Sequence, residues 1–195
     1  MKKIIIIFIF FLFHSVNVIA DSSNEIKRIV VGNKNAKITI IAYESLTCSH
    51  CADFHIDVYP ELKKDYIDTG LAKIEFRHFP LDVAALNASK VSQCKNDGKS
   101  RILNSLFLNQ GKWAKGKTIE EVNENLKKFL NSEKIKIDLN RCINNKKIED
   151  FILNDRIEGV KKFKVNATPT IIINGKKFEK TLNYKNLKKS LEKLI

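Results

Sequence analysis

The chain has 195 residues, of which 44% are hydrophobic and 29% are charged, proportions typical of a soluble globular protein. They exclude collagen, a wholly disordered chain and a polytopic membrane protein, and the length suits one domain, or one domain with an insertion. The net charge is +13, from 35 Lys and Arg against 22 Asp and Glu. Because the lysines are scattered through every segment rather than gathered with aromatic residues, we expect no nucleic-acid partner.

The first twenty residues have the pattern of a secretory signal peptide. Two lysines precede an unbroken apolar run over residues 4–13, which is too short for a membrane span of about 20 residues. Val18 and Ala20 then supply the small residues of a cleavage site. We therefore expect 1–20 to be a signal peptide that is removed on export, and the alternative is an uncleaved anchor. An exported chain can keep disulfide bonds.

The next segments predict a strand, a helix and a strand. An apolar patch at 26–31 is a candidate edge strand, and the β-branched run 38–43 suits a buried central strand. A helix over 48–68 should kink at Pro60, and a second strand follows over 71–79. One helix face carries an apolar residue at every fourth position: Phe54, Val58, Leu62 and Tyr66. This order is a βαβ unit, so we expect its two strands to be parallel.

Residues 81–164 predict only helices. Asp82 and Ser100 can cap the first two, and Thr118 with Glu121 matches the capping box of a third. We interpret the segment as a helical insertion, since its apolar residues recur at helical spacing.

Further helices are expected at 139–143 and 147–163, and a loop bounded by Gly111 and Gly116 should hold Trp113. Three apolar residues of the insertion would belong to its core or, alternatively, to an exposed surface near the active site: Phe107, Leu108 and Trp113.

A strand is expected over 168–173, followed by the hairpin signal Asn174-Gly175 and a return strand over 176–178. A final amphipathic helix would pack four residues: Tyr184, Leu187, Leu191 and Leu194. The fold class is therefore α/β, with the order βαβ, helical insertion, ββα. We expect one domain over 21–80 and 165–195, interrupted by the insertion at 81–164.

The segment Cys48-Ser49-His50-Cys51 carries the chemistry. A C-x-x-C pair can be half of a zinc site, a structural disulfide or a redox pair. Zinc requires four ligands, and a second C-x-x-C is absent. The pair follows a buried strand and opens a helix, where free N–H groups and the helix dipole favour a thiolate. This placement favours a redox pair, so we expect no metal and no cofactor.

The Cys-Ser-His-Cys motif and the downstream Ala167-Thr168-Pro169-Thr170 resemble the DsbA group of thioredoxin-fold thiol:disulfide oxidoreductases. That group carries a helical domain between the two halves of its thioredoxin-like fold, where this chain has its insertion. The likeness is greatest to alphaproteobacterial homologues, which share Leu46-Thr47-Cys48-Ser49-His50-Cys51.

The resemblance assigns a role to each matching residue. Cys48 would be the nucleophile, Cys51 its buried partner, and His50 would stabilise the Cys48 thiolate. Pro169 would be a cis-proline, with Thr168 facing the cysteine pair.

The chain departs from the family at one position. Relatives often have a buried acidic residue six positions before the first cysteine, where this chain has Ala42. Glu44 lies two positions on, and therefore on the same strand face, so it is the candidate replacement.

Three further predictions concern residues outside the motif. Cys94 and Cys142 are expected to form a structural disulfide, because an exported chain with an even number of cysteines favours pairing and some relatives have a comparable pair. The alternative is two buried free thiols. His55 is expected on the helix surface. His78 is expected to have a structural role.

The resemblance implies a monomeric periplasmic enzyme that introduces disulfides into reduced secreted proteins. It also implies reoxidation by a quinone-linked membrane oxidase of the DsbB type. The alternatives are an isomerase or reductase of the same fold, an exported copper or zinc carrier using the C-x-x-C pair, and a non-catalytic substrate-binding module.

Overall fold

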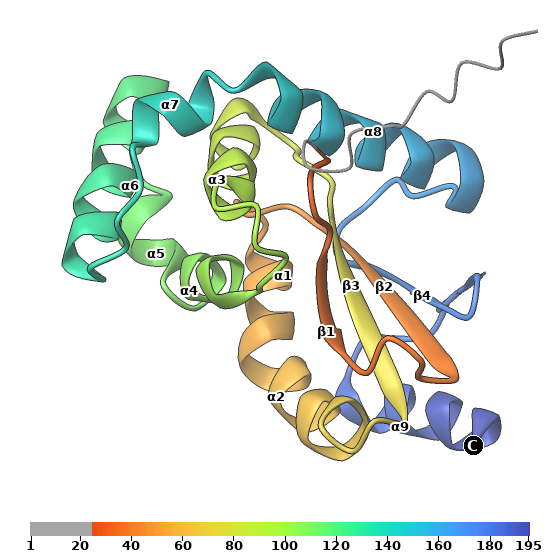
Figure 1. Ribbon diagram of the computed structural model, residues 1–195. Coiled ribbons are helices and arrows are strands. Elements are labelled where there is room, and N and C mark those ends of the chain that lie inside the picture. Colours follow the sequence, from red (N-terminus) through yellow and green to blue (C-terminus); the bar gives the residue numbers. More distant parts are fainter. Residues whose placement is uncertain (1–24) are drawn as a thin grey trace, which may run out of the picture.

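A five-stranded mixed sheet lies at the centre of the computed structural model, which describes residues 25–195 (Figure 1). The predicted signal peptide lies outside the described residues. The strand order is β1-β3-β2-β4-β5, and the strands are β1 (Ile29–Gly32), β2 (Ile38–Glu44), β3 (Ala72–His78), β4 (Thr170–Ile173) and β5 (Lys176–Lys177). Only β2 and β3 pair in parallel, which confirms the βαβ unit. The expected edge strand is β1, antiparallel to β3.

The helix that connects β2 to β3 alternates between α and π turns. Its four pieces are α1 (Ser49–Asp53), η2 (Phe54–Val58), α2 (Tyr59–Leu62) and η3 (Lys63–Ile67). The first π turn ends just before Pro60, which lies in the first turn of α2. Proline is tolerated in the first turn of a helix, because the N–H it lacks would have no partner there. The helix is therefore irregular near Pro60, as expected, and the irregularity is the π turn that precedes α2.

Every regular element between β3 and β4 is a helix, as predicted. The six helices are α3 (Val83–Gln93), α4 (Arg101–Leu108), α5 (Gln110–Trp113), α6 (Ile119–Ser132), α7 (Leu139–Ile143) and α8 (Lys146–Phe163). In Figure 1, α6 and α7 lie away from the sheet, whereas α8 runs back across one end of it.

Two of the three predicted caps are made by side chains. Asp82 accepts a hydrogen bond from the Ala85 amide at 2.7 Å, and Thr118 accepts one from the Glu121 amide at 3.3 Å. The Glu121 carboxylate accepts from the Lys117 amide instead of the Thr118 amide, so the capping box is only half formed. Ser100 stands at the N-cap of α4 but makes no capping hydrogen bond.

The expectation of a loop around Trp113 is wrong. Trp113 ends α5, is fully buried, and donates from its indole nitrogen to the Leu106 carbonyl at 2.8 Å. Burial of this ring outweighs the turn signal of Gly111, because a large aromatic side chain contributes more than a glycine costs within a helix. Phe107 is buried with it, whereas Leu108 is 54% exposed.

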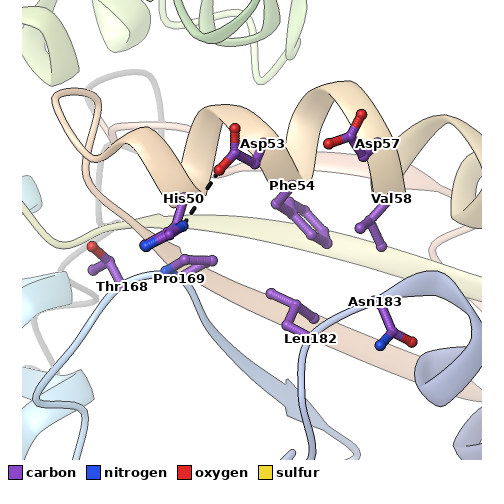
Figure 2. Close-up of a pocket in the computed structure, with 9 residues that line it drawn as sticks. All are labelled: His50, Asp53, Phe54, Asp57, Val58, Thr168, Pro169, Leu182 and Asn183. Carbon is purple, nitrogen blue, oxygen red and sulfur yellow. Dashed lines mark ion pairs between the residues drawn. The ribbon is translucent and has the colours of Figure 1, made fainter.

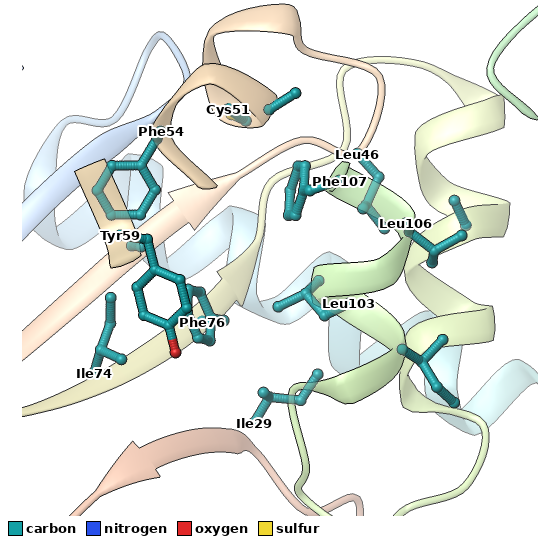
Figure 3. Close-up of a cluster of buried hydrophobic side chains, with 14 of the residues drawn as sticks. Ile29, Leu46, Cys51, Phe54, Tyr59, Ile74, Phe76, Leu103, Leu106 and Phe107 are labelled. Atoms are coloured by element: carbon teal, nitrogen blue, oxygen red, sulfur yellow. The ribbon is translucent and has the colours of Figure 1, made fainter. Parts of the chain in front are cut away.

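The insertion and the sheet share one hydrophobic core (Figure 3). Leu103 and Phe107 of α4 face the helix after β2, which contributes Phe54 and Tyr59, and Phe76 of β3 lies behind them. The helix after β2 is therefore covered on two sides, by the sheet and by α4.

A buried ion network holds α8 against the sheet. Asp155 of α8 is 2% exposed and accepts from Arg28 at 2.5 Å, with Arg77 of β3 at 4.0 Å from the same oxygen. The second Asp155 oxygen lies 3.4 Å from the His78 amide nitrogen. The carboxylate thus bridges the segment before β1, the end of β3 and α8.

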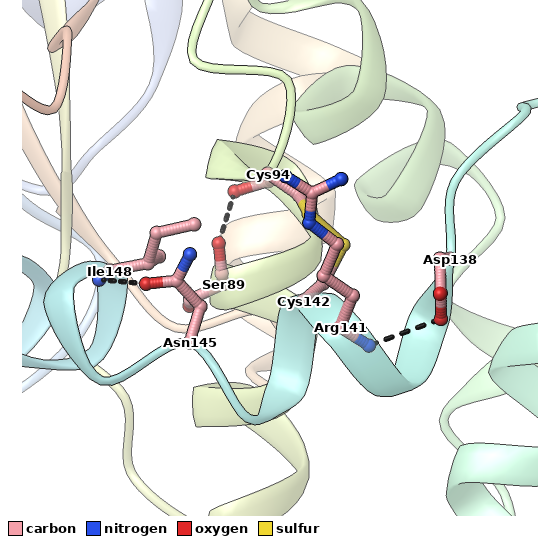
Figure 4. Close-up of a disulfide and its surroundings, with 8 residues drawn as sticks. Ser89, Cys94, Asp138, Arg141, Cys142, Asn145 and Ile148 are labelled. Carbon is pink, nitrogen blue, oxygen red and sulfur yellow. Dashed lines mark hydrogen bonds between the residues drawn. A yellow bond between two sulfur atoms is a disulfide. The ribbon is translucent and has the colours of Figure 1, made fainter. Parts of the chain in front are cut away.

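A disulfide joins Cys94, at the end of α3, to Cys142 of α7, as expected (Figure 4). The buried Lys90 supports the same contact, since its ammonium donates to the Ile143 carbonyl at 2.8 Å and pairs with Glu149.

The chain closes with the β4–β5 hairpin, α9 (Tyr184–Leu191) and the short 3₁₀ turn η4 (Glu192–Leu194). Asn174 and Gly175 both have positive φ, as the predicted hairpin turn requires. Leu187 and Leu191 are buried, but Leu194 is 44% exposed. Within residues 25–195, none of the helices combines the length and the apolar character needed to cross a bilayer.

Candidate active site

Cys48 occupies the N-cap of α1, directly after the turn that follows β2. It is partly buried, Cys51 is fully buried, and neither is in a disulfide. A hydrogen bond from the Cys51 thiol, assisted by Thr168 and by the amides of Cys51 and His50, lowers the pKa of Cys48 from 9.0 to about 5 despite partial burial. Cys48 is therefore a thiolate at neutral pH.

Cys51 has the opposite character. Burial raises the pKa of its thiol, and the hydrogen bond to Cys48 and the negative charge of Glu44 raise it further. The reduced pair thus holds one accessible thiolate and one buried thiol, which suits a nucleophile and a resolving cysteine.

Glu44, at the end of β2, is 3% exposed and lies close enough to the pair for its charge to act on Cys51. Burial raises the pKa of the Glu44 carboxyl, and the hydrogen bond from His55 opposes this rise. Ala42, which stands where relatives often have the buried acidic residue, is fully buried and apolar. The acidic group beneath the pair is therefore supplied by Glu44.

The expectation that His55 lies on the helix surface is wrong. His55 is 2% exposed, and its Nε2 lies 3.1 Å from both carboxylate oxygens of Glu44. The Phe107 ring of α4 stacks on the imidazole with a centroid distance of 4.1 Å. The face of the helix that would meet solvent in a simple βαβ unit is covered here by the insertion.

Thr168 and Pro169 reach the cysteines from the loop before β4. The Thr168–Pro169 peptide bond is cis, and the Thr168 carbonyl oxygen lies 3.3 Å from Cys48 Sγ. Tyr43, near the end of β2, pairs with Thr170 at the start of β4. The loop that follows β2 and leads to Cys48 therefore lies beside the loop that precedes β4.

A groove of about 440 Å³ runs beside the pair (Figure 2). Phe54 and Val58 point into it from the helix, and Leu182 faces them from the opposite wall. His50 lies near Thr168 and Pro169 at one end of the groove. Its imidazole is 82% exposed, with Nδ1 3.3 Å from an Asp53 oxygen, so the His50 group that acts on Cys48 is its amide.

Two further residues hold the loop before Cys48, and the sequence predicts this role for neither. Gln110 of α5 donates from Nε2 to the carbonyls of Leu46 at 2.9 Å and Cys48 at 3.0 Å. Asp82, besides capping α3, accepts from the Thr47 hydroxyl at 2.7 Å. No sequence signal links Gln110 to this loop, because the contact depends on how the insertion packs.

His78 is buried at the end of β3, with Nε2 3.2 Å from Gln93 Nε2. Burial lowers its pKa to about 3, and the charge of Arg28 adds to this effect. A neutral imidazole within the core agrees with the structural role expected for it. Among residues 25–195, no three His, Cys, Asp or Glu side chains gather as metal ligands.

Known proteins share this fold. The family described as Thioredoxin matches residues 24–193. The crystal structure of alpha-DsbA1 from Wolbachia pipientis superposes with a TM-score of 0.76 and 32% identity, over 86% of this chain and 90% of that one. The chain is a DsbA-like member of the thioredoxin family.

Curated relatives of this DsbA-like chain bear related names. A Rickettsia conorii protein named as a protein-disulfide oxidoreductase is 31% identical over 75% of this chain. The disulfide bond formation protein D of Bacillus subtilis is 26% identical over 84% of this chain and 75% of its own length. The DsbA-like chain spans only 53% of the length of the Rickettsia conorii relative.

Proposed function

We propose that this chain is an exported thiol:disulfide oxidoreductase that introduces disulfide bonds into reduced secreted proteins. The observation that carries the proposal is the pairing of a Cys48 thiolate, with a pKa of about 5, and a buried Cys51 thiol whose pKa is raised. A stabilised thiolate is a good leaving group, and it also stabilises the reduced form of the pair. Both effects favour oxidation of the substrate.

In the oxidised enzyme, a substrate thiolate attacks Cys48 Sγ, the Cys48–Cys51 bond breaks, and Cys51 leaves and gains a proton. A second substrate thiolate then attacks the substrate sulfur of the mixed disulfide, which releases Cys48 as a thiolate. The substrate loses two electrons and the cysteine pair gains them. Near the pair, Glu44 is the carboxyl group that can supply and accept the Cys51 proton.

The other parts of the proposal concern the whole protein. Residues 1–20 would direct export to the periplasm, and the mature monomer would comprise a thioredoxin-like domain over 21–80 and 165–195 with the helical insertion at 81–164. A quinone-linked membrane oxidase of the DsbB type would reoxidise the pair, with no bound cofactor. Sequencing of the mature N-terminus tests removal of residues 1–20, and cell fractionation tests export to the periplasm. Light scattering tests the monomeric state. Reoxidation by membrane vesicles with added quinone tests the membrane oxidase.

The decisive experiment measures the redox equilibrium of Cys48–Cys51 with glutathione, together with oxidation of a reduced, unfolded substrate. We expect a potential well above that of the glutathione pool and rapid substrate oxidation, both lost in Cys48→Ser. The variant Cys94→Ala/Cys142→Ala is the matched control, because it removes the other cysteine pair and should keep the activity. A potential near that of thioredoxin would favour the reductase or isomerase instead.

Two alternatives give different results in the same preparation. A copper or zinc carrier would hold metal at a stoichiometry that depends on Cys48 and Cys51. A non-catalytic binding module would keep its function in Cys48→Ala.

A further inference from the structure

The pair formed by Glu44 and His55 lies beneath the cysteines, and the proposed function gives no role to its imidazole. Both side chains are buried, with exposed fractions of 3% and 1%. The His55 Nε2 is equidistant, at 3.1 Å, from the two Glu44 oxygens, so one N–H is shared between them. A buried carboxylate with a single centred donor is held in a fixed orientation.

The surroundings of His55 determine which of its nitrogens carries a proton. The ring is enclosed by aromatic groups, with Phe107 stacked on it at 4.1 Å and the Phe76 and Tyr59 rings at 5.3 and 5.4 Å. Nδ1 is buried and has no hydrogen-bond partner. Protonation of Nδ1 would leave a buried donor unsatisfied, which is costly. The geometry therefore favours the hydrogen on Nε2, which donates a hydrogen bond to Glu44.

Several titratable groups face Glu44 besides His55. Cys48 and Cys51 approach it from α1. Tyr59 faces it from α2, where burial raises the pKa of the phenol to about 12. His78 lies beside it in β3, where burial lowers the imidazole pKa to about 3. The Tyr59 phenol and the His78 imidazole are thus neutral at pH 7.

We propose that His55 is a positioning residue for oxidation of the cysteine pair: its Nε2–H stabilises the ionised form of Glu44 and orients this carboxylate so that it accepts the Cys51 proton. The inference rests on the proposed function. In the step concerned, Cys48 is joined by a disulfide to a sulfur of the oxidant. Cys51 loses its proton to Glu44 and attacks Cys48 Sγ, the Cys48–Cys51 bond forms, and the oxidant sulfur leaves as a thiolate. The proton on Glu44 then passes to water.

The histidine matters in only one direction of the reaction. Without the donor, the pKa of Glu44 rises further, because the hydrogen bond from His55 opposes the effect of burial, and less carboxylate is left to accept a proton. A protonated Glu44 can still donate to Cys51 when a substrate opens the disulfide. We therefore expect a variant without the donor to be oxidised more slowly, but to be reduced at an unchanged rate.

Two substitutions separate the hydrogen bond from the packing. His55→Phe keeps an aromatic ring against Phe107 but removes the donor, whereas His55→Gln removes the ring but keeps an amide N–H within reach of Glu44. The rate of oxidation by glutathione disulfide is measured by stopped flow from pH 6 to 9, above the pKa of Cys48. The pH at which this oxidation rate is half-maximal should rise by about one to two units in His55→Phe. In His55→Gln this pH midpoint should return to the value of the unchanged protein. When His55→Phe is added to the Glu44→Gln variant, the oxidation rate and its pH dependence should not change further.

The outcomes distinguish the inference from the proposed function. If the unchanged protein does not oxidise a dithiol substrate, the proposed function fails. If it does, but His55→Phe leaves the pH midpoint unchanged, the role of His55 is refuted. Equal shifts in the Phe and Gln variants, each with a lowered Tm, would show that His55 acts through packing alone. If His55→Phe does not fold, His55→Asn replaces it, because its amide is one methylene too short to reach Glu44.

Discussion

Acidification through pH 5 should remove the extra stability of the reduced cysteine pair. The pKa of Cys48 is about 5 in the fold against 9.0 for an ordinary thiol. A group with a lowered pKa stabilises the fold fully above its unfolded pKa, and this stabilisation is lost as the pH falls through the folded pKa. At pH 7, two units above the folded pKa, the thiolate contributes about 2.7 kcal/mol to the reduced form, or about 60 mV to the potential.

The assay is a series of glutathione redox titrations between pH 3.5 and 8, with the thiolate followed by its absorbance at 240 nm. Because the pKa of Cys51 is raised, this thiol keeps its proton throughout the range. Above pH 5, reduction takes up one proton for two electrons, so the potential should fall by about 30 mV per pH unit. Below pH 5 it takes up two protons, and the slope should double to about 60 mV.

A single slope across the whole range would refute this reasoning, and so would a break above pH 7. Two variants remove competing explanations. Cys94→Ala/Cys142→Ala leaves one redox pair to titrate, and Glu44→Gln removes the nearby buried acid whose pKa is also raised. As an independent check, the stability of the reduced form relative to the oxidised form should fall by about 2.7 kcal/mol between pH 7 and pH 4.

Three further variants test other contacts. Gln110→Leu loses two hydrogen bonds to the loop before Cys48, so it should lower the free energy of unfolding by about 1–2 kcal/mol and raise the pKa of the nucleophile; an unchanged 240 nm titration would contradict this. Cys94→Ala/Cys142→Ala opens a cross-link of 48-residue separation and should cost up to about 4 kcal/mol, measured by urea unfolding, with little effect on activity. Asp155→Asn leaves Arg28 without its buried partner, so it should cost about 3 kcal/mol in calorimetry while the redox potential stays the same.

The parts of the fold that depend on local pattern could be predicted from the sequence. The cysteine pair opens a helix after a buried strand because β-branched runs and helical periodicity are local properties. The hairpin at Asn174 and Gly175 and the helices at 139–143 and 147–163 follow from the same kind of signal. The cis peptide bond is predicted by the resemblance, and the disulfide by the even number of cysteines together with the resemblance, so neither follows from local pattern.

The parts that depend on packing between distant segments could not be predicted. The sequence predicts a solvent-facing His55, because one apolar stripe is enough to pack its helix on the sheet. In the structure, α4 covers a second face of this helix and stacks Phe107 on the imidazole. Gln110 was not recognised for the same reason, since its partners Leu46 and Cys48 lie more than 60 positions away. Trp113 was placed in a loop because its burial depends on the fold of the insertion.

Both edges of the sheet are protected, which bears on how this protein behaves at high concentration. At one edge, Val30 of β1 donates to the Gly98 carbonyl at 3.4 Å, and Asn96 side-chain contacts cover the segment just before the strand. At the other, β5 is only two residues long, and both residues are lysines. Short, covered or lysine-bearing edges disfavour strand addition by a second chain. The proposed function brings this protein into contact with unfolded polypeptides, and such edges would disfavour β-aggregation with them.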